Sequence, residues 1–131
     1  LHRGLAARNV KDITAGEVAD IYSNDYWLKG SCPELPEPLD LVHFDACVNH
    51  GLSRAAKLLQ EVLGVKIDGD IGPKTRTAAR DLAFIPALEA ARKYISLREN
   101  FYQFLVERKP QMAVFLQGWL NRMRDLRKEV G

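Results

Sequence analysis

Residues 39–50 read Leu-Asp-Leu-Val-His-Phe-Asp-Ala-Cys-Val-Asn-His, and this stretch decides the fold. If it is a helix, its apolar side chains point in most directions around the axis: Val42, Phe44, Ala46, Cys47 and Val48. A helix that is apolar all round is buried by its neighbours. Gly51 then reads as a helix stop, and Ser53 as the N-cap of a second helix over residues 54–63. We therefore expect a central helix enclosed by others.

The segments on either side also predict helices. Upstream, Thr14 and Glu17 form a capping box, and the helix that they open runs to about Trp27. Downstream, helical spacing extends from Pro86 to about residue 109 and again over residues 111–128. A short proline-containing link between two such helices favours an antiparallel pair. The expected fold class is all-α.

Residues 65–75 form the one clear non-helical stretch. It holds an Asp-Gly turn, and Pro73 is suited to the first position of a following helix. The sequence Asp68-Gly69-Asp70 looks like a calcium loop, but the twelfth position is Ala79, where an EF-hand needs a bidentate glutamate. We therefore interpret it as a turn.

Composition narrows the class of protein. The chain has 131 residues, 47% hydrophobic and 27% charged, as expected for one ordinary domain. No apolar run approaches the ~20 residues of a membrane helix. The net charge of +2 is too small to argue for nucleic acid. Residues 92–131 nevertheless hold nine Lys and Arg against four Asp and Glu, which fits either a solvated helix face or a surface for an anionic polymer.

The cysteines and histidines give no metal pattern. Cys32 lies in a polar loop and Cys47 in the apolar helix, so there is no CxxC pair; free thiols are the default and a disulfide stays open. His43 and His50 are seven residues apart, are expected near the helix surface, and belong to no His-Glu-x-x-His motif. We predict neither a metal site nor a cofactor.

Two groups of residues could carry function. Asp45 and Asn49 share a helix face, and a buried carboxylate is costly unless it is paired or lies at a cleft. Asp45 therefore either bridges neighbouring structure or lines a substrate groove. An aromatic cluster, Tyr22, Tyr26 and Trp27, suits sugar rings, and equally suits core packing. No nucleophile motif is present, which leaves Asp45 as the foremost candidate for acid–base chemistry.

Three segments, in order, resemble a known family. Residues 12–27 and 44–51 are similar to the later part of the muramidases of glycoside hydrolase family 108, which also includes proteins described as secretion activators. Residues 59–75 and 98–122 resemble the predicted peptidoglycan-binding module that follows in those proteins. The resemblance implies a lysozyme-like helical fold with a small C-terminal helical module. It divides the chain into residues 1–66, the later part of the hydrolase domain, and 67–131, the module, packed as one compact unit.

The resemblance also implies a reaction, cleavage of the peptidoglycan glycan strand by a catalytic Glu in a Glu-Gly-Gly motif. The 131 residues contain no such motif, so we expect the acid upstream of Leu1. The chain would supply the substrate-binding wall: Tyr22, Tyr26, Trp27, Asp45, Asn49 and His50.

Three functions remain open at this stage. The first is a bacterial or phage N-acetylmuramidase that is made in the cytoplasm and acts at the cell wall or periplasm, such as an endolysin. The second is a non-catalytic wall-binding or secretion-accessory protein. The third is a helical protein–protein adaptor. The first two have peptidoglycan glycan strands as the partner, and none involves nucleic acid, a transmembrane segment or a cofactor.

Overall fold

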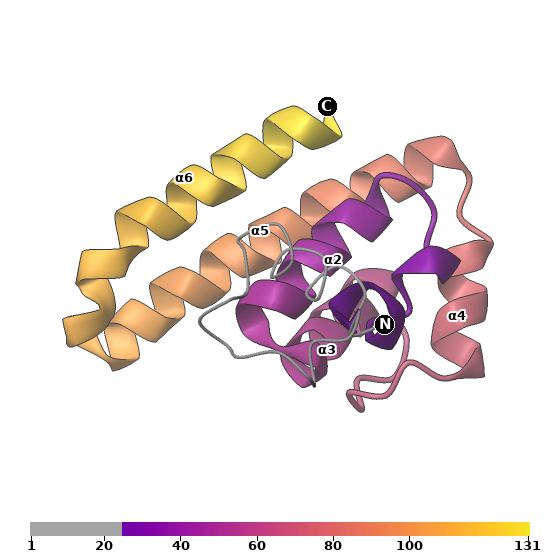
Figure 1. The fold of residues 1–131 in the computed structure, drawn as a ribbon, viewed down its shortest axis with the longest axis horizontal. Helices are drawn as coiled ribbons and strands as arrows, with labels where there is room; N and C mark the ends of the chain where they lie inside the picture. Colours follow the sequence, from indigo (N-terminus) through magenta and orange to yellow (C-terminus); the bar gives the residue numbers. More distant parts are fainter. Residues whose placement is uncertain (1–24) are drawn as a thin grey trace, which may run out of the picture.

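The computed structural model describes residues 25–131, and every regular element in that range is helical (Figure 1). After a helical segment at residues 25–29, the elements are η3 (Cys32–Glu34), α2 (Leu39–His50), α3 (Leu52–Leu63), α4 (Pro73–Arg80), α5 (Phe84–Arg108), η4 (Pro110–Met112) and α6 (Ala113–Val130). The predicted all-α class is confirmed. Most of the helix expected from Thr14 lies outside the described residues.

Helix α2 is the central element, as its all-round apolar pattern predicts. It packs against α3 and α5, and Leu39, Val42, Ala46 and Cys47 are buried on it. His43 is also fully buried, so the prediction that it lies near the surface is wrong. The physical reason is that both of its ring nitrogens find partners inside the fold, the hydroxyl of Tyr94 and the carbonyl of Gly30.

Glycine and proline set the helix ends. Gly51 ends α2 with φ of 88°, a conformation that glycine adopts without steric cost, and α3 begins at the next residue. Ser53 is therefore not an N-cap, and that prediction is wrong, because a one-residue reversal at Gly51 leaves no room for a separate cap. Gly64, with φ of 71°, ends α3, and Pro73 opens α4 at its first position, as the sequence predicts.

The last two long helices form the predicted antiparallel pair, and Figure 1 shows α6 running back along α5. Helix α5 begins at Phe84, two residues before Pro86, because the first turn of a helix has no internal use for the N–H that proline lacks. Pro110 opens the short η4 turn between the two helices. An Arg127–Glu99 ion pair of 2.7 Å links α6 back to α5.

One hydrophobic core runs through the described residues. It is built from Leu35, which follows η3, and from buried side chains of α2 to α6: Leu39, Val42, Ala46, Cys47, Ala55, Leu58, Leu59, Ala79, Ala91, Tyr94, Ile95, Tyr102, Met123 and Leu126. All these elements share this one core within the described residues. None of the helices between residues 25 and 131 combines the length and the apolar character that crossing a membrane requires.

Candidate functional site

Asp45 lies at the junction of three helices. Its Oδ2 is 2.8 Å from Nη1 of Arg98 on α5. Arg122 on α6 makes a bidentate contact, with Nε donating to Oδ2 at 3.2 Å and Nη2 to Oδ1. Arg98 is fully buried, whereas half of the Arg122 side chain is exposed. The contact with Asp45 raises the pKa of Arg122. We call Asp45, Arg98 and Arg122 the ionic junction.

The ionic junction bears on the two interpretations of Asp45. Both carboxylate oxygens of Asp45 accept from guanidinium groups, and the pair with the buried Arg98 is part of the packing between α2 and α5. A general acid needs a carboxyl group that is directed at a substrate and can donate a proton to it. The contacts that Asp45 makes are those of a residue that bridges neighbouring structure.

His50 ends α2 beside the ionic junction. Nε of Arg98 donates to its Nε2 at 2.9 Å, so that nitrogen carries a lone pair rather than a proton. Burial, and then the charge of Arg98, lower the pKa of His50 from 6.5 to about 4. Its ring stacks on Tyr102 at 5.0 Å between centroids, and Tyr102 stacks on Trp119 at 4.7 Å. These rings continue the contact between α2, α5 and α6.

Asn49 is exposed, and its side chain is turned back onto its own helix. Its Nδ2 donates to the backbone carbonyl of Asp45 at 2.8 Å. Near by, a hollow of about 310 Å³ opens between α2 and α6, lined by Asp45, Gly118, Asn121, Arg122, Asp125, Leu126 and Glu129. Its lining mixes both signs of charge, with three carboxylates and one guanidinium group.

Trp27 lies at a different hollow, of about 320 Å³, which it shares with Glu37, Pro38, Asp40 and Leu41. The ring meets Phe44 edge-on, with centroids 5.6 Å apart. Burial raises the pKa of Asp40, and the nearby charge of Glu37 adds to the effect. A half-buried tryptophan beside two carboxylates offers a flat apolar face and hydrogen-bond acceptors, which are the groups that a sugar ring needs.

The predicted wall residues therefore divide into two sets. Trp27 lines one hollow and Asp45 the other, while Tyr26 borders a smaller hollow of about 130 Å³ with Asp25, Lys29 and Leu52. Asn49 and His50 belong with Asp45, and Tyr22 lies outside the described residues. None of these three hollows is lined by both sets.

Gln60 explains the turn that contains Asp68-Gly69-Asp70. Its side chain is fully buried on α3, and Nε2 donates to the side chain of Asp68 at 2.9 Å and to the carbonyl of Asp70 at 2.8 Å. Its Oε1 accepts from the N–H groups of Asp68 and Gly69 at 3.0 and 2.9 Å. The turn is thus held by protein hydrogen bonds. Nothing in the sequence pattern singled out Gln60.

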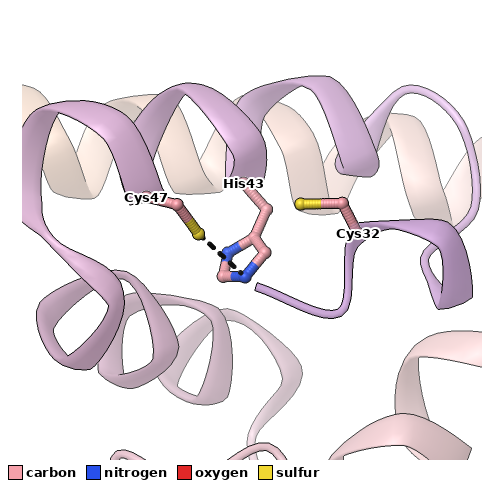
Figure 2. A group of neighbouring side chains, drawn as sticks. All are labelled: Cys32, His43 and Cys47. Atoms are coloured by element: carbon pink, nitrogen blue, oxygen red, sulfur yellow. Dashed lines mark hydrogen bonds between the residues drawn. The ribbon is translucent and has the colours of Figure 1, made fainter. Parts of the chain in front are cut away.

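A second group that the sequence did not predict is buried between η3 and α2. Cys32, His43 and Cys47 are each fully buried, and one potential ligand atom from each lies within 4.8 Å of the others (Figure 2). The two sulfurs are not bonded to each other. Hydrogen bonds from Cys32 and then from His43 lower the pKa of Cys47 to about 5, while the contact with Cys47 and burial raise that of Cys32.

Comparison with known families finds a match for each of two parts of the chain. Residues 54–124 match the family described as a predicted peptidoglycan domain. The chain belongs to that family. Residues 2–51 match glycosyl hydrolase 108, so the resemblance drawn from the sequence is confirmed for both parts. The ionic junction joins the two matched regions, because Asp45 lies in the first and Arg98 and Arg122 lie in the second.

Among solved structures, the chain is similar to one titled "Structure of Brucella abortus SagA". The two are 30% identical, with a TM-score of 0.70. The match covers 92% of this chain and 66% of that one, just under two thirds of its length. A search of curated protein sequences found no match.

Proposed function

We propose that the protein is a peptidoglycan hydrolase that acts at the bacterial cell wall, and specifically an N-acetylmuramidase. The observation that carries this proposal is the order of the two family matches, glycosyl hydrolase 108 followed by the predicted peptidoglycan domain, over residues 2–51 and 54–124. The likeness to the Brucella abortus SagA structure supports it. The partner is the glycan strand of peptidoglycan.

The chemistry requires a proton donor. Glycoside cleavage needs a carboxylic acid that protonates the leaving oxygen, and such a donor contributes a factor of about 10² to 10⁴ in rate. Asp45 does not suit this role, because both of its carboxylate oxygens are engaged by arginines. No Glu-Gly-Gly motif occurs in the 131 residues. We therefore propose that the acid is a glutamate of a segment upstream of Leu1, and that the described chain supplies binding and support.

For glycan contact we propose the Trp27 hollow. Its volume of about 320 Å³ falls within the range of small-ligand pockets. The tryptophan face can stack on the C–H face of a sugar ring, and Asp40 and Glu37 can accept hydrogen bonds from its hydroxyl groups. Tyr22 and Tyr26 are proposed to extend this aromatic surface. Asp45, Asn49 and His50 are then proposed to support the site rather than to line it.

The test is cleavage of purified peptidoglycan. A longer form that includes the upstream Glu-Gly-Gly segment should release muropeptides with new N-acetylmuramic acid reducing ends, detected by mass spectrometry. The matched control replaces that glutamate with glutamine, and should lose at least about a hundredfold in rate. Products with reducing N-acetylglucosamine ends would contradict the muramidase assignment. Failure of any form to release fragments would contradict the hydrolase assignment.

The second candidate is a wall-binding or secretion-accessory protein without catalysis. The observation that favours it is that the predicted peptidoglycan domain covers more than half of the chain, while the 131 residues hold no Glu-Gly-Gly motif. It predicts that the chain sediments with insoluble peptidoglycan and that no extended form releases reducing ends. The two candidates thus agree on binding and differ on products.

A further inference from the structure

We propose that Cys32, His43 and Cys47 bind one zinc ion, with the backbone carbonyl of Gly30 completing the site. The ion would be structural, and would fasten the segment that carries Trp27 to α2. The proposal concerns the described chain alone, and it holds whether or not the protein cleaves peptidoglycan.

The residues converge from two elements. His43 and Cys47 are four residues apart on α2 and so lie on one face, while Cys32 comes from η3. Figure 2 shows the sulfur of Cys47 pointing at the His43 ring from one side and the sulfur of Cys32 pointing toward His43 from the other. Two sulfurs and one imidazole are the ligands that zinc prefers in structural sites.

The spacing fits a tetrahedral ion. Zinc lies ~2.3 Å from sulfur and ~2.0 Å from imidazole nitrogen, so neighbouring ligand atoms are about 3.5 to 3.8 Å apart. Nε2 of His43 is 3.5 Å from Sγ of Cys47, and all three ligand atoms lie within 4.8 Å of one another. A disulfide, in contrast, requires the two sulfurs to close to ~2.0 Å and makes no use of the histidine.

Because Gly30 has no side chain, the sulfurs of Cys32 and Cys47 can lie close to its backbone. A Cβ atom at this position would lie 2.6 Å from the sulfur of Cys47, 2.8 Å from the backbone oxygen of Tyr26 and 3.4 Å from the sulfur of Cys32, so an alanine here would displace both backbone and sulfur. Its carbonyl oxygen is 2.9 Å from Nε2 of His43. This oxygen is close enough to serve as the fourth ligand, since zinc also accepts oxygen donors.

The hydrogen bonds around His43 orient it as a ligand. Its Nδ1 is 2.8 Å from the Tyr94 hydroxyl, which donates its only proton to the carbonyl of Ala55 at 3.0 Å. With zinc on Nε2, Nδ1 carries the ring proton and donates it to the Tyr94 oxygen, as in metal-bound histidines, whose second nitrogen donates to a neighbouring acceptor. In the chain without metal, Nε2 lies 2.9 Å from the Gly30 carbonyl, an acceptor, so zinc binding would replace that contact with a bond to the ion.

Burial defines the kind of site. All three side chains are fully buried, so no position is open for a substrate, and closed sites are structural. Zinc would displace the thiol protons to solvent and bind both cysteines as thiolates. It would join η3 to α2, and so stabilise the backbone that leads from Trp27 into the central helix.

The test uses the reduced chain after removal of metal by a chelator. Titration with Co²⁺ should produce the visible bands of a tetrahedral ion together with thiolate-to-cobalt charge transfer. Equilibration with Zn²⁺ and dialysis should leave one zinc per chain by elemental analysis. Zinc should raise the melting temperature by about 10 °C or more relative to the chelated protein.

Variants locate the ion. Cys32→Ser and Cys47→Ser should each abolish the charge-transfer band or halve it, and Gly30→Ala, which keeps every ligand, should weaken binding at least tenfold. His50→Gln is the matched control, since it removes the neighbouring histidine of α2 and should leave stoichiometry unchanged. If a cysteine variant fails to fold, the wild-type cobalt spectrum and zinc stoichiometry decide alone.

Two results would overturn the proposal. One is a reduced wild-type chain that retains no zinc and gives no cobalt–thiolate band. The other is a chain purified under air whose mass is lower by two hydrogens and which binds no metal after reduction, because the pair would then be a disulfide.

Discussion

At the scale of single residues, the sequence leaves two roles open for Asp45, and the structure shows its contacts. The sequence places a carboxylate on a helix that must be buried, which limits it to pairing or to a cleft. The partners, Arg98 and Arg122, come from other helices, and Arg122 is 77 residues away. No pattern local to α2 could name them. The type of contact was predictable, whereas the identity of the partners depends on how α5 and α6 fold back.

Asp45→Asn should lower the free energy of unfolding by about 3 kcal/mol, because it leaves the buried Arg98 without its counter-charge. Arg122→Ala should cost less than about 1 kcal/mol, since that side chain is half exposed and solvent screens it. Urea unfolding at pH 7 measures both. Equal losses in the two variants would contradict the asymmetry between a buried and an exposed partner.

His50 should make stability depend on pH. Its pKa is lowered from 6.5 to about 4 in the folded chain, so the unfolded chain takes up a proton first as the pH falls. The stabilisation is complete above about pH 6.5 and is lost progressively toward pH 4, by about 2 kcal/mol at pH 4.5.

The matched variant for this effect is His50→Gln, which keeps an acceptor for Arg98 but cannot gain a proton. Urea unfolding at pH 7.5 and 4.5 measures the free energy of unfolding of both proteins. The amount by which the variant is less stable than wild type should be about 2 kcal/mol smaller at pH 4.5 than at pH 7.5. Parallel stability curves for the two proteins would show that His50 does not titrate in this way.

At the scale of elements, the sequence predicted what local chemistry controls. Gly51, Gly64 and Pro73 were assigned to helix ends, because positive φ and a missing N–H act within one turn. The errors also have local causes. Ser53 was chosen as a cap because the composition favours it, but Gly51 already reverses the chain. The seven-residue spacing of His43 and His50 predicts one face near the helix surface for both, yet two internal partners hold His43 inside the fold.

The turn between α3 and α4 depends on one side chain of α3. Gln60→Leu should lower the free energy of unfolding by about 2 to 4 kcal/mol, because the N–H groups of Asp68 and Gly69 lose their shared acceptor. Gln117→Leu is the control, since Gln117 makes only an exposed bond to Asn121, and it should change stability by less than about 0.5 kcal/mol. Chemical denaturation compares them, and similar effects would contradict the role of Gln60.

At the scale of the whole molecule, the family resemblance could be predicted from the order of three sequence segments, and the comparisons confirm it. The candidate site was harder. The sequence identifies the aromatic and acidic residues by type, but Trp27, which precedes α2, and Asp45, which lies on α2, line different hollows, and that arrangement depends on how the helices pack. The contact between the two matched regions is carried by the ionic junction and by the rings of His50, Tyr102 and Trp119.

A shared core predicts one cooperative unfolding transition for both regions. Trp27 reports on the first and Trp119 on the second, so Trp27→Phe and Trp119→Phe each leave one fluorescent probe. In urea, the fluorescence transition of each variant should coincide with its own transition by circular dichroism. A midpoint for the Trp27 probe well below that of circular dichroism would indicate two separately folding units.

Recognition of peptidoglycan through the Trp27 hollow is the central proposal. Co-sedimentation of the purified chain with insoluble peptidoglycan tests it. We predict that the wild-type chain sediments with the polymer. Trp27→Ala should weaken this binding at least about tenfold, as the loss of a central aromatic contact does in other interfaces. Phe84 is an exposed aromatic residue away from both hollows, so the control variant Phe84→Ala should leave the binding unchanged. A folded wild-type chain that stays in the supernatant, or a Trp27→Ala variant that binds as tightly as wild type, would contradict it.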